Sequence, residues 1–393
     1  MKTIPVFGTR GLLLILGVAL GVGFSAPVFP AFARAPHTAV IVNPDGKVMY
    51  LGTLGGQSSE ASGINDSGQV VGSSITGGFV GGFHAFITGP NGRGMIDLGT
   101  LGGRNSYALD INDAGQVVGY SEDNETVDDP PWHAFITGPN GMGMTDLGTL
   151  GGSSSIATGI NDSGQVVGHF YTDSWHAFIT GPNGMGMTDL GTLGGTYSMA
   201  SGINDSGQVV GRSTTADGRT HAFITGPNGM GMTDLGTLDT VGGAYSVAND
   251  INDVGQVVGH STVGLSHHAF ITGPNGVGMT DLGTLVDTVG GGYSSANDIN
   301  DVGQVVGEAY QHGPIGFITG PNGMGMTDLY SLVGIQGRAD FSSVYAINNL
   351  GQVSTTLPAI PEPASYALML AGLGLVGFMV RRKKLPNNIV ARG

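Results

Sequence analysis

The feature that most limits the fold of this chain is a tandem repeat that fills most of its length. The segment Ile64–Gly72, with the sequence Ile-Asn-Asp-Ser-Gly-Gln-Val-Val-Gly, returns with small changes starting at Ile111, Ile160, Ile203, Ile251, Ile299 and Ile347. A second segment, His84–Gly92, recurs in step with it, starting at His133, His176, His221 and His268, and in diverged form at Gly316 and Ala39. There are seven copies of each segment, about 47 residues apart, so one structural unit repeats seven times.

Each repeat reads as two β-hairpins in sequence. The strand His-Ala-Phe-Ile-Thr is followed by Gly-Pro-Asn-Gly, a turn signal in which proline presets φ and glycine supplies a positive φ. Met-Thr-Asp-Leu-Gly is a second strand, and a Gly-Gly loop leads to a third, such as residues 107–111. Asn-Asp-x-Gly then turns the chain into a fourth strand, Gln-Val-Val-Gly. Adjacent apolar residues in three of the strands are typical of sheets buried on both faces.

Four strands in about 47 residues are typical of a propeller blade, because a ring of such blades buries both faces of every sheet and leaves only short edges. We therefore predict an all-β fold, a seven-bladed β-propeller over residues 36–358. The repeats resemble the HAF repeat of bacterial extracellular proteins. The resemblance rests on the triplet His84-Ala85-Phe86, on Asp97-Leu98-Gly99 and on residues 111–119. It implies an extracellular setting but no defined activity.

Residues 1–35 have the layout of a secretory signal peptide. Lys2 and Arg10 flank the start of an apolar run over residues 11–20, and the small residues Ala31 and Ala33 give the pattern of a cleavage site. The pattern predicts export through Sec. An uncleaved N-terminal membrane anchor is the alternative interpretation.

Residues 359–393 form a second targeting segment. The triplet Pro361-Glu362-Pro363 precedes an uncharged run over residues 364–380, which is predicted as a transmembrane helix. Four basic residues follow and should stay cytoplasmic: Arg381, Arg382, Lys383 and Lys384.

This arrangement resembles the PEP-CTERM sorting signal of Gram-negative bacteria. The resemblance implies recognition by an exosortase-type transpeptidase in a cell that exports polysaccharide. Residues 385–393 depart from it, because such signals usually end at the basic cluster. A plain tail anchor is the alternative.

Charge and composition exclude several classes of function. The formal net charge is −15, and only six of the 14 basic residues but 28 of the 29 acids lie between residues 36 and 358. Such a body repels phosphates and anionic lipid headgroups, so nucleic-acid binding is not expected. The absence of cysteine excludes disulfides, thiol catalysis and cysteine metal sites.

No catalytic constellation is recognisable, and no catalytic, cofactor-binding or metal-ligating residue is predicted. The repeated histidines would form a metal-binding ring only if their strand lined the channel. The alternative is that each histidine starts a strand and hydrogen-bonds a neighbouring backbone group. The Asn-Asp-x-Gly segments lack the further acids of a calcium loop, so we interpret them as turns.

One insertion is unique to a single repeat and is the candidate ligand loop. It runs from residue 122 to residue 132, and its candidate ligand residues are Glu122, Asp123, Glu125, Asp128, Asp129 and Trp132. Its carboxylates are suited to Ca²⁺, the one cofactor that the sequence suggests, and Trp132 is suited to stacking on a sugar. The alternative is a solvated loop in which Trp132, like Trp175, packs at a strand start.

The sequence thus predicts an exported cell-surface or extracellular-matrix protein that is held by its tail. Near-identical blades favour a non-enzymatic scaffold or binding propeller, since an asymmetric active site would need specialised blades. One alternative is a module that binds exopolysaccharide. The other is a hydrolase or lyase, which would need acids from different blades that converge at the channel mouth.

Overall fold

The computed structural model describes residues 36–77, 81–123, 131–239, 244–285, 292–310, 313–333 and 344–358. The chain divides into two compact units, residues 1–35 and 36–393. The predicted signal peptide and the predicted transmembrane helix 364–380 lie outside the described residues. Within the described ranges, no helix is long and apolar enough to cross a membrane.

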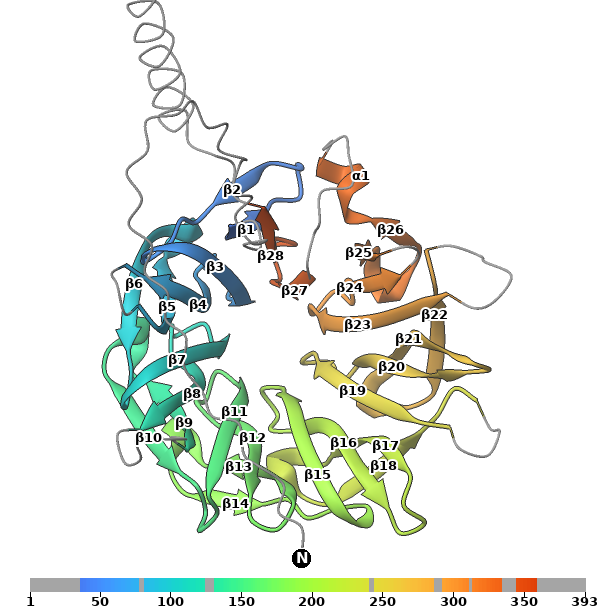
Figure 1. Ribbon diagram of the computed structural model, residues 1–393. Coiled ribbons are helices and arrows are strands. Elements are labelled where there is room, and N and C mark those ends of the chain that lie inside the picture. The colour runs from blue at the N-terminus through green and yellow to red at the C-terminus, as the bar shows by residue number, and fades with distance from the viewer. Residues whose placement is uncertain are drawn as a thin grey trace, which may run out of the picture. The chain divides into compact units, whose positions relative to one another are not determined.

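Seven four-stranded antiparallel sheets stand as blades around a central axis, which confirms the predicted seven-bladed propeller (Figure 1). Blade 1 contains, from the channel outward, β3 (Gly55–Ile64), β4 (Val70–Thr76), β5 (Phe83–Gly89) and β6 (Arg93–Gly99). Blade 2 contains β7 (Gly102–Ile111), β8 (Val117–Asp123), β9 (Trp132–Thr137) and β10 (Met144–Gly148). Blade 3 contains β11 (Ser154–Ile160), β12 (Val166–Tyr171), β13 (Trp175–Thr180) and β14 (Met187–Asp189).

The next three blades repeat this order. Blade 4 contains β15 (Gly194–Ile203), β16 (Val209–Thr215), β17 (Thr220–Thr225) and β18 (Met232–Gly236). Blade 5 contains β19 (Ser246–Ile251), β20 (Val257–Val263), β21 (Ser266–Thr272) and β22 (Met279–Gly283). Blade 6 contains β23 (Tyr293–Ile299), β24 (Val305–Tyr310), β25 (Pro314–Thr319) and β26 (Met326–Asp328), after which comes the short helix α1 (Leu329–Val333).

Blade 7 closes the ring with strands from both ends of the propeller. Its inner strands are β27 (Val344–Ile347) and β28 (Val353–Pro358), and its outer strands are β1 (His37–Val42) and β2 (Val48–Tyr50). β1 pairs antiparallel with β28 from His37 opposite Pro358 to Val42 opposite Val353. The strand that begins with the His-Ala-Phe triplet is therefore the third of its blade, and the innermost strand is the one that ends in Ile-Asn-Asp.

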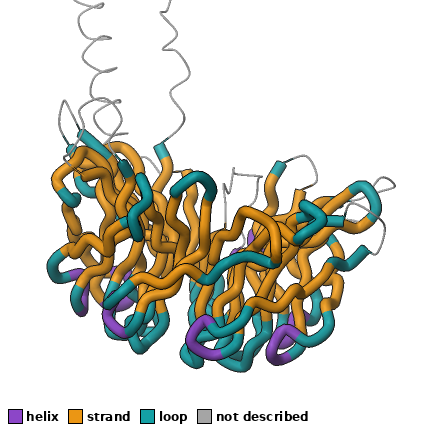
Figure 2. The backbone as a smooth tube through the Cα atoms, turned by 90° about the horizontal axis from the view of Figure 1, so that it is seen from below, coloured by secondary structure: helices purple, strands orange, loops and turns teal. Residues whose placement is uncertain are grey.

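The two faces of the ring carry different connections. The Ile-Asn-Asp turns and the Gly-Pro-Asn-Gly turns lie on one face, here called the turn face, and the links between blades lie on the opposite, crossover face. Six single 3-10 turns mark the turn face in Figure 2: η1 (Pro90–Gly92), η2 (Pro139–Gly141), η3 (Pro182–Gly184), η4 (Pro227–Gly229), η5 (Pro274–Gly276) and η6 (Pro321–Gly323). In η1 both Asn91 and Gly92 have positive φ, 54° and 69°, so the asparagine as well as the glycine reverses the chain.

The hydrophobic core is divided among the seven junctions between blades. At the first junction, Val71 and Ile87 of blade 1 pack against Ile111 and Phe135 of blade 2. Equivalent clusters fill the other six junctions. The triplet phenylalanine is fully buried in six blades: Phe86, Phe135, Phe178, Phe223, Phe270 and Phe317. Burial on both sheet faces explains the adjacent apolar residues of the strands.

Candidate functional site

The Ile-Asn-Asp turns of six blades and the Ile-Asn-Asn turn of blade 7 meet around the axis and line a cavity of about 210 Å³ at the mouth of the channel. The glycine of the Asn-Asp-x-Gly turn, or of the Asn-Asn-x-Gly turn in blade 7, has a positive φ in every blade, for example +72° at Gly68. This is the conformation that the turn interpretation predicts. Asn65 supports its own turn by accepting the N–H of Gln69 at 2.9 Å. The side chains that remain at the mouth are six aspartates and one asparagine: Asp66, Asp113, Asp162, Asp205, Asp253, Asp301 and Asn349.

These seven residues form a closed ring of hydrogen bonds. The backbone N–H of Asp66 donates to Asp113 Oδ1 at 2.9 Å, and each blade repeats this bond to the next one at 2.8–3.1 Å. Asn349 stands where the others have aspartate, and its amide also donates to Asp66 Oδ2 and Asp301 Oδ2. Within each turn the asparagine side chain thus accepts the backbone N–H, whereas the aspartate side chain links neighbouring blades.

A second closed ring lies beside the first and is made by the turn asparagines. Asn65 Nδ2 donates to the carbonyl oxygen of Asn112 at 3.1 Å, and all seven blades make the same bond at 2.9–3.1 Å. The asparagine side chains are buried, with Asn112 only 4% exposed. Because a buried amide that loses its partner is costly, these bonds hold the blades in register.

Three more carboxyl groups lie one residue before the isoleucine, at Asp110, Asp250 and Asp298. Blades 1, 3 and 4 have Gly63, Gly159 and Gly202 at this position, and blade 7 has Ala346. Asp110 accepts the N–H groups of Ile111 at 2.8 Å and of Ile160 at 2.9 Å. Asp298 accepts those of Ile299 at 2.7 Å and of Ile347 at 2.6 Å.

Burial changes the protonation of two of these groups. It raises the pKa of Asp110 to about 7, even though the two backbone hydrogen bonds favour the carboxylate. Burial also raises the pKa of Asp250 well above its ordinary value, and the charge of Asp298 and a side-chain hydrogen bond with it raise that pKa further. Acids from different blades therefore do converge at the channel mouth, as a hydrolase or lyase would require, but backbone amides occupy both oxygens of Asp110 and of Asp298.

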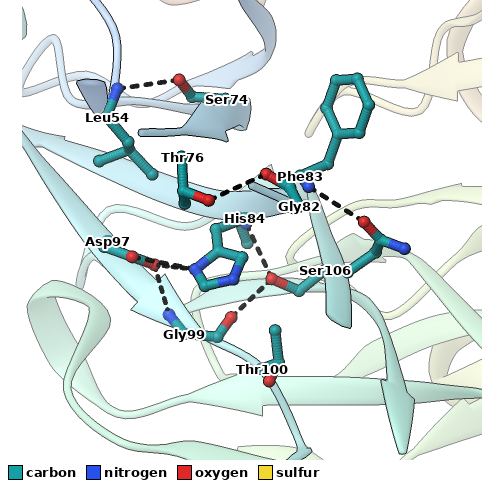
Figure 3. Close-up of polar contacts among 12 residues, drawn as sticks. Leu54, Ser74, Thr76, Gly82, Phe83, His84, Asp97, Gly99, Thr100 and Ser106 are labelled. Atoms are coloured by element: carbon teal, nitrogen blue, oxygen red, sulfur yellow. Dashed lines mark hydrogen bonds and ion pairs between the residues drawn. The ribbon is translucent and has the colours of Figure 1, made fainter. Parts of the chain in front are cut away.

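The histidines of the triplet do not line the channel, so the hypothesis of a metal-binding histidine ring is wrong. His84 Nδ1 lies 2.9 Å from both carboxylate oxygens of Asp97 on the outermost strand, as Figure 3 shows. His133, His176, His221 and His268 pair in the same way with Asp146, Asp189, Asp234 and Asp281. Each histidine is the second or third residue of its strand and not the first, and its partner is a carboxylate and not a backbone group. Within the described ranges, no group of His, Asp and Glu side chains is arranged to hold a metal ion.

A serine completes this arrangement across the blade junction. Ser106 of blade 2 accepts the N–H of Ala85 at 2.8 Å and donates to the carbonyl of Gly99 at 2.5 Å (Figure 3). The described residues repeat this bridge at five further junctions, through Ser59, Ser155, Ser198, Ser246 and Ser294. The triplet is therefore a structural motif that joins the third and fourth strands of one blade to the next blade.

The candidate ligand loop is described only at its two ends. Glu122 is 8% exposed, and its carboxylate accepts the backbone N–H groups of Arg104 at 2.9 Å and Asn105 at 3.0 Å. Asp123 Oδ2 lies 3.5 Å from His133 Nε2. Glu125, Asp128 and Asp129 lie outside the described residues. Glu122 therefore supports the start of β7, and a ligand role for the rest of the loop stays a prediction.

Both tryptophans lie at half-buried strand starts and touch other rings. Trp132 packs edge-on against Tyr120 with 5.1 Å between centroids, and Trp175 packs against His169 at 4.9 Å. The residues of the sorting triplet, the basic cluster and the signal-peptide cleavage site lie outside the described residues. The channel aspartates and the inter-blade rings were missed from the sequence, although the repetition of Asn-Asp in six of seven turns was a signal for them.

The seven-bladed fold and a C-terminal sorting motif together define this chain as an exported β-propeller. The PEP-CTERM protein-sorting motif matches residues 359–383, and it implies an exported protein with a cell-surface fate that an exosortase-type system recognises. No curated protein matches the chain. The resemblance to the HAF repeat stays a prediction.

Solved structures of β-propellers resemble the described fold at low sequence identity. A puromycin hydrolase is 11% identical with a TM-score of 0.50, over 76% of this chain and 52% of that one. The β-propeller domain of the trilobed protease from Pyrococcus furiosus is 10% identical with a TM-score of 0.49, over 72% and 82%. TolB from Acinetobacter baumannii is 10% identical with a TM-score of 0.44, over 84% and 65%. The likeness to the hydrolase concerns the fold alone.

Proposed function

We propose that the chain is a cell-surface or extracellular-matrix protein whose propeller is a non-enzymatic scaffold or binding module. In this proposal an exosortase-type transpeptidase recognises the tail, and the segment 364–380 holds the protein in the membrane before or after processing. The observation that carries the proposal is that the polar residues common to the blades hold the ring together. The side chains of the turn asparagines, the turn aspartates and the triplet histidines all form hydrogen bonds with neighbouring strands or blades.

The sorting part of the proposal is tested by replacing Pro361, Glu362 and Pro363 together with alanine in the native host. We expect the variant to be exported but not processed, because the recognition triplet is gone. The size and cellular location of the protein are measured by immunoblotting of cell fractions. Pro386→Ala, a proline outside the triplet, is the control and should be processed normally. Normal processing of the triple variant would contradict exosortase sorting.

The first alternative, a module that binds exopolysaccharide, is favoured by the two half-exposed tryptophans and their neighbouring rings. The test is a binding assay of the exported protein with the host's own exopolysaccharide, with and without calcium. Saturable binding places the propeller among matrix-binding proteins. Replacing Glu125, Asp128 and Asp129 by the corresponding amides separates a calcium-dependent loop from a calcium-independent surface.

The second alternative, a hydrolase or lyase, is favoured by Asp110, Asp250 and Asp298 at the channel mouth. The test is incubation of the exported protein with the host's exopolysaccharide, followed by measurement of new reducing ends and of unsaturated products by absorbance. The non-enzymatic proposal expects no product above that of a heat-inactivated control. Product formation that Asp250→Asn abolishes would favour the enzyme instead.

A further inference from the structure

Two positions in each blade differ from blade to blade, although each lies next to a nearly constant residue. The first lies on the second strand, opposite the alanine of the triplet, and holds Ser73, Tyr120, His169, Arg212, His260, Glu308 and Thr356. The second directly precedes the triplet and holds Phe83, Trp132, Trp175, Thr220, His267 and Pro314 in the first six blades. We call these the variable positions.

The contrast with the preceding residue on the second strand shows that packing does not dictate this variation. That residue is glycine in six blades, opposite the buried phenylalanine. A Cβ added at Gly72 would lie 1.9 Å from the carbonyl oxygen of Glu60, so the blade cannot accept a side chain there. One residue later the same strand accepts tyrosine, arginine, histidine and glutamate, which differ in size and charge. In repeat proteins, the differences between repeats often gather on one face, and that face is often the binding face.

In three blades both variable positions hold rings that touch one another. The pairs are Tyr120–Trp132, His169–Trp175 and His260–His267, with centroids 5.1, 4.9 and 5.9 Å apart. Residues of this kind bury apolar area and still offer a polar group for hydrogen bonding. Their strands end at the crossover face, opposite the aspartate ring.

Two larger groups of touching rings lie in the described blades. One holds five rings in blades 5 and 6, Tyr245, His260, His267, Tyr293 and Tyr310. The other holds four rings in blades 1 and 2, includes Trp132, and precedes the blade of Trp175. Tyr107 stacks on Tyr120 with centroids 5.0 Å apart and 23° between planes, and Phe83 stacks on Tyr107 at 5.7 Å and 25°. Trp132 meets both tyrosines edge-on. Phe83 is 36% exposed, so the array is open to solvent at one end. We call these four residues the aromatic array.

Blade 3 adds an observation that packing does not explain. His169 is 9% exposed, and its Nδ1 is buried without a hydrogen-bond partner in the described part of the chain. An orphaned buried polar atom costs stability, so a native structure that keeps one calls for an explanation, of which a ligand that supplies the missing hydrogen bond is one. This nitrogen belongs to the imidazole that packs against Trp175. Both residues are in blade 3, the blade that follows the aromatic array of blades 1 and 2.

We propose that the aromatic array and the neighbouring His169–Trp175 pair form the binding site for a neutral polysaccharide. This inference rests on the polysaccharide-binding alternative given above and adds its site and its ligand class. The C–H faces of sugar rings stack on aromatic rings, while sugar hydroxyls exchange hydrogen bonds with tyrosine, histidine and carboxylate groups. A body with a large excess of acids repels polyanions, so acidic polysaccharide and nucleic acid are the wrong partners.

The two tryptophans of the chain are Trp132 and Trp175, so tryptophan fluorescence, excited at a wavelength that tyrosine does not absorb, reports on this surface. The full-length protein exported by its host is titrated with the neutral and the acidic fractions of the host's exopolysaccharide, separated by anion exchange. A Trp175→Phe variant leaves Trp132 as the only reporter. We expect the neutral fraction to shift its emission in a saturable way and the acidic fraction to leave it unchanged.

Substitutions then locate the site. Trp132→Ala and Tyr107→Ala should each weaken binding of the neutral fraction about tenfold or more, measured by affinity electrophoresis, whereas Trp132→Phe should stay within about threefold because it keeps a ring. Tyr50→Ala, at a 38% exposed tyrosine on the outermost strand of blade 7, is the matched control and should bind as wild type. Circular dichroism and a thermal melt of each variant identify any that fail to fold.

Unchanged binding in folded Trp132→Ala and Tyr107→Ala variants would overturn the site while leaving polysaccharide binding in place. Binding of the acidic fraction only would overturn the ligand class. Binding of neither fraction would remove both this inference and the polysaccharide alternative, and the sorting experiment would still stand on its own.

Discussion

The turn face and the crossover face of the ring are built from the same repeats, yet they differ in how much the blades resemble each other. On the turn face, the Ile-Asn-Asp turn is nearly constant and its side chains close two rings of hydrogen bonds. Toward the crossover face, the residue opposite the triplet alanine is a different type in almost every blade. The constant face therefore holds the ring together, whereas the residues toward the crossover face vary between blades without loss of the ring.

Removing one whole repeat is the strongest test of this division. Deletion of residues 160–202 joins two equivalent positions and leaves six blades. Because β1 must still pair with β28 and both hydrogen-bond rings must close, we expect aggregation and loss of a cooperative melt. Size-exclusion chromatography and differential scanning calorimetry measure this. A soluble six-blade monomer that melts cooperatively would show that the rings do not set the number of blades.

Asn112→Ala tests the inner ring of the turn face. The substitution removes the amide that donates to the carbonyl of Asn161 and the oxygen that accepts the N–H of Gln116, both buried. We expect the free energy of unfolding to fall by about 2–3 kcal/mol in a denaturant titration. Val302→Ser is the control, since Val302 is 52% exposed in the same kind of turn and serine stands there in other blades. An equal loss in both variants would contradict a special role for the asparagine ring.

Asp110→Ala tests the channel acids. Alanine is chosen because Ala346 occupies the equivalent position in blade 7. The raised pKa of Asp110, about 7, means that the folded protein prefers the protonated acid. Its contribution to stability is therefore fully present below about pH 4 and is lost as the pH rises through 7. The stability of the wild type relative to the variant should fall by at most about 4 kcal/mol over this range. A difference that does not change between pH 5 and pH 8 would contradict the raised pKa.

The histidine residues His169 and His260 provide the internal check for that experiment. Burial lowers the pKa of each to about 4, so their contribution is present above pH 6.5 and is lost as the pH falls toward 4. This effect has the opposite sign and is the same in wild type and variant. Only the difference between the two proteins, measured at each pH, therefore reports on Asp110.

His84→Ala should have the smallest effect, although the triplet is the most visible motif of the sequence. The His84 and Asp97 side chains are 25% and 42% exposed, and a pair this accessible contributes less than about 1 kcal/mol. Ser106→Ala should cost more, because it leaves the buried N–H of Ala85 without its acceptor. Chemical denaturation of both variants measures the order, and a larger loss for His84→Ala would contradict it.

The number of blades and the position of each strand were predictable, because period and turn residues recur in register along the chain. The phase of the blades was not, since a cyclic repeat of four strands has the same sequence pattern whichever strand is innermost. Bonds such as that from Asp66 to Asp113 join residues one repeat apart, and no local pattern reveals them. Asp110 could have been found by comparing repeats, because glycine stands at its position in three blades.

The closing pair β1–β28 also sets an order in time. Among the strands of the described residues, β1 is synthesised first and β28 last, so β1 lacks its partner until the whole propeller has been made and exported. Contacts this distant in sequence form slowly. The ring is completed only when the residues just before the sorting segment emerge. Closure of the propeller and presentation of the sorting segment to the sorting machinery are therefore consecutive steps.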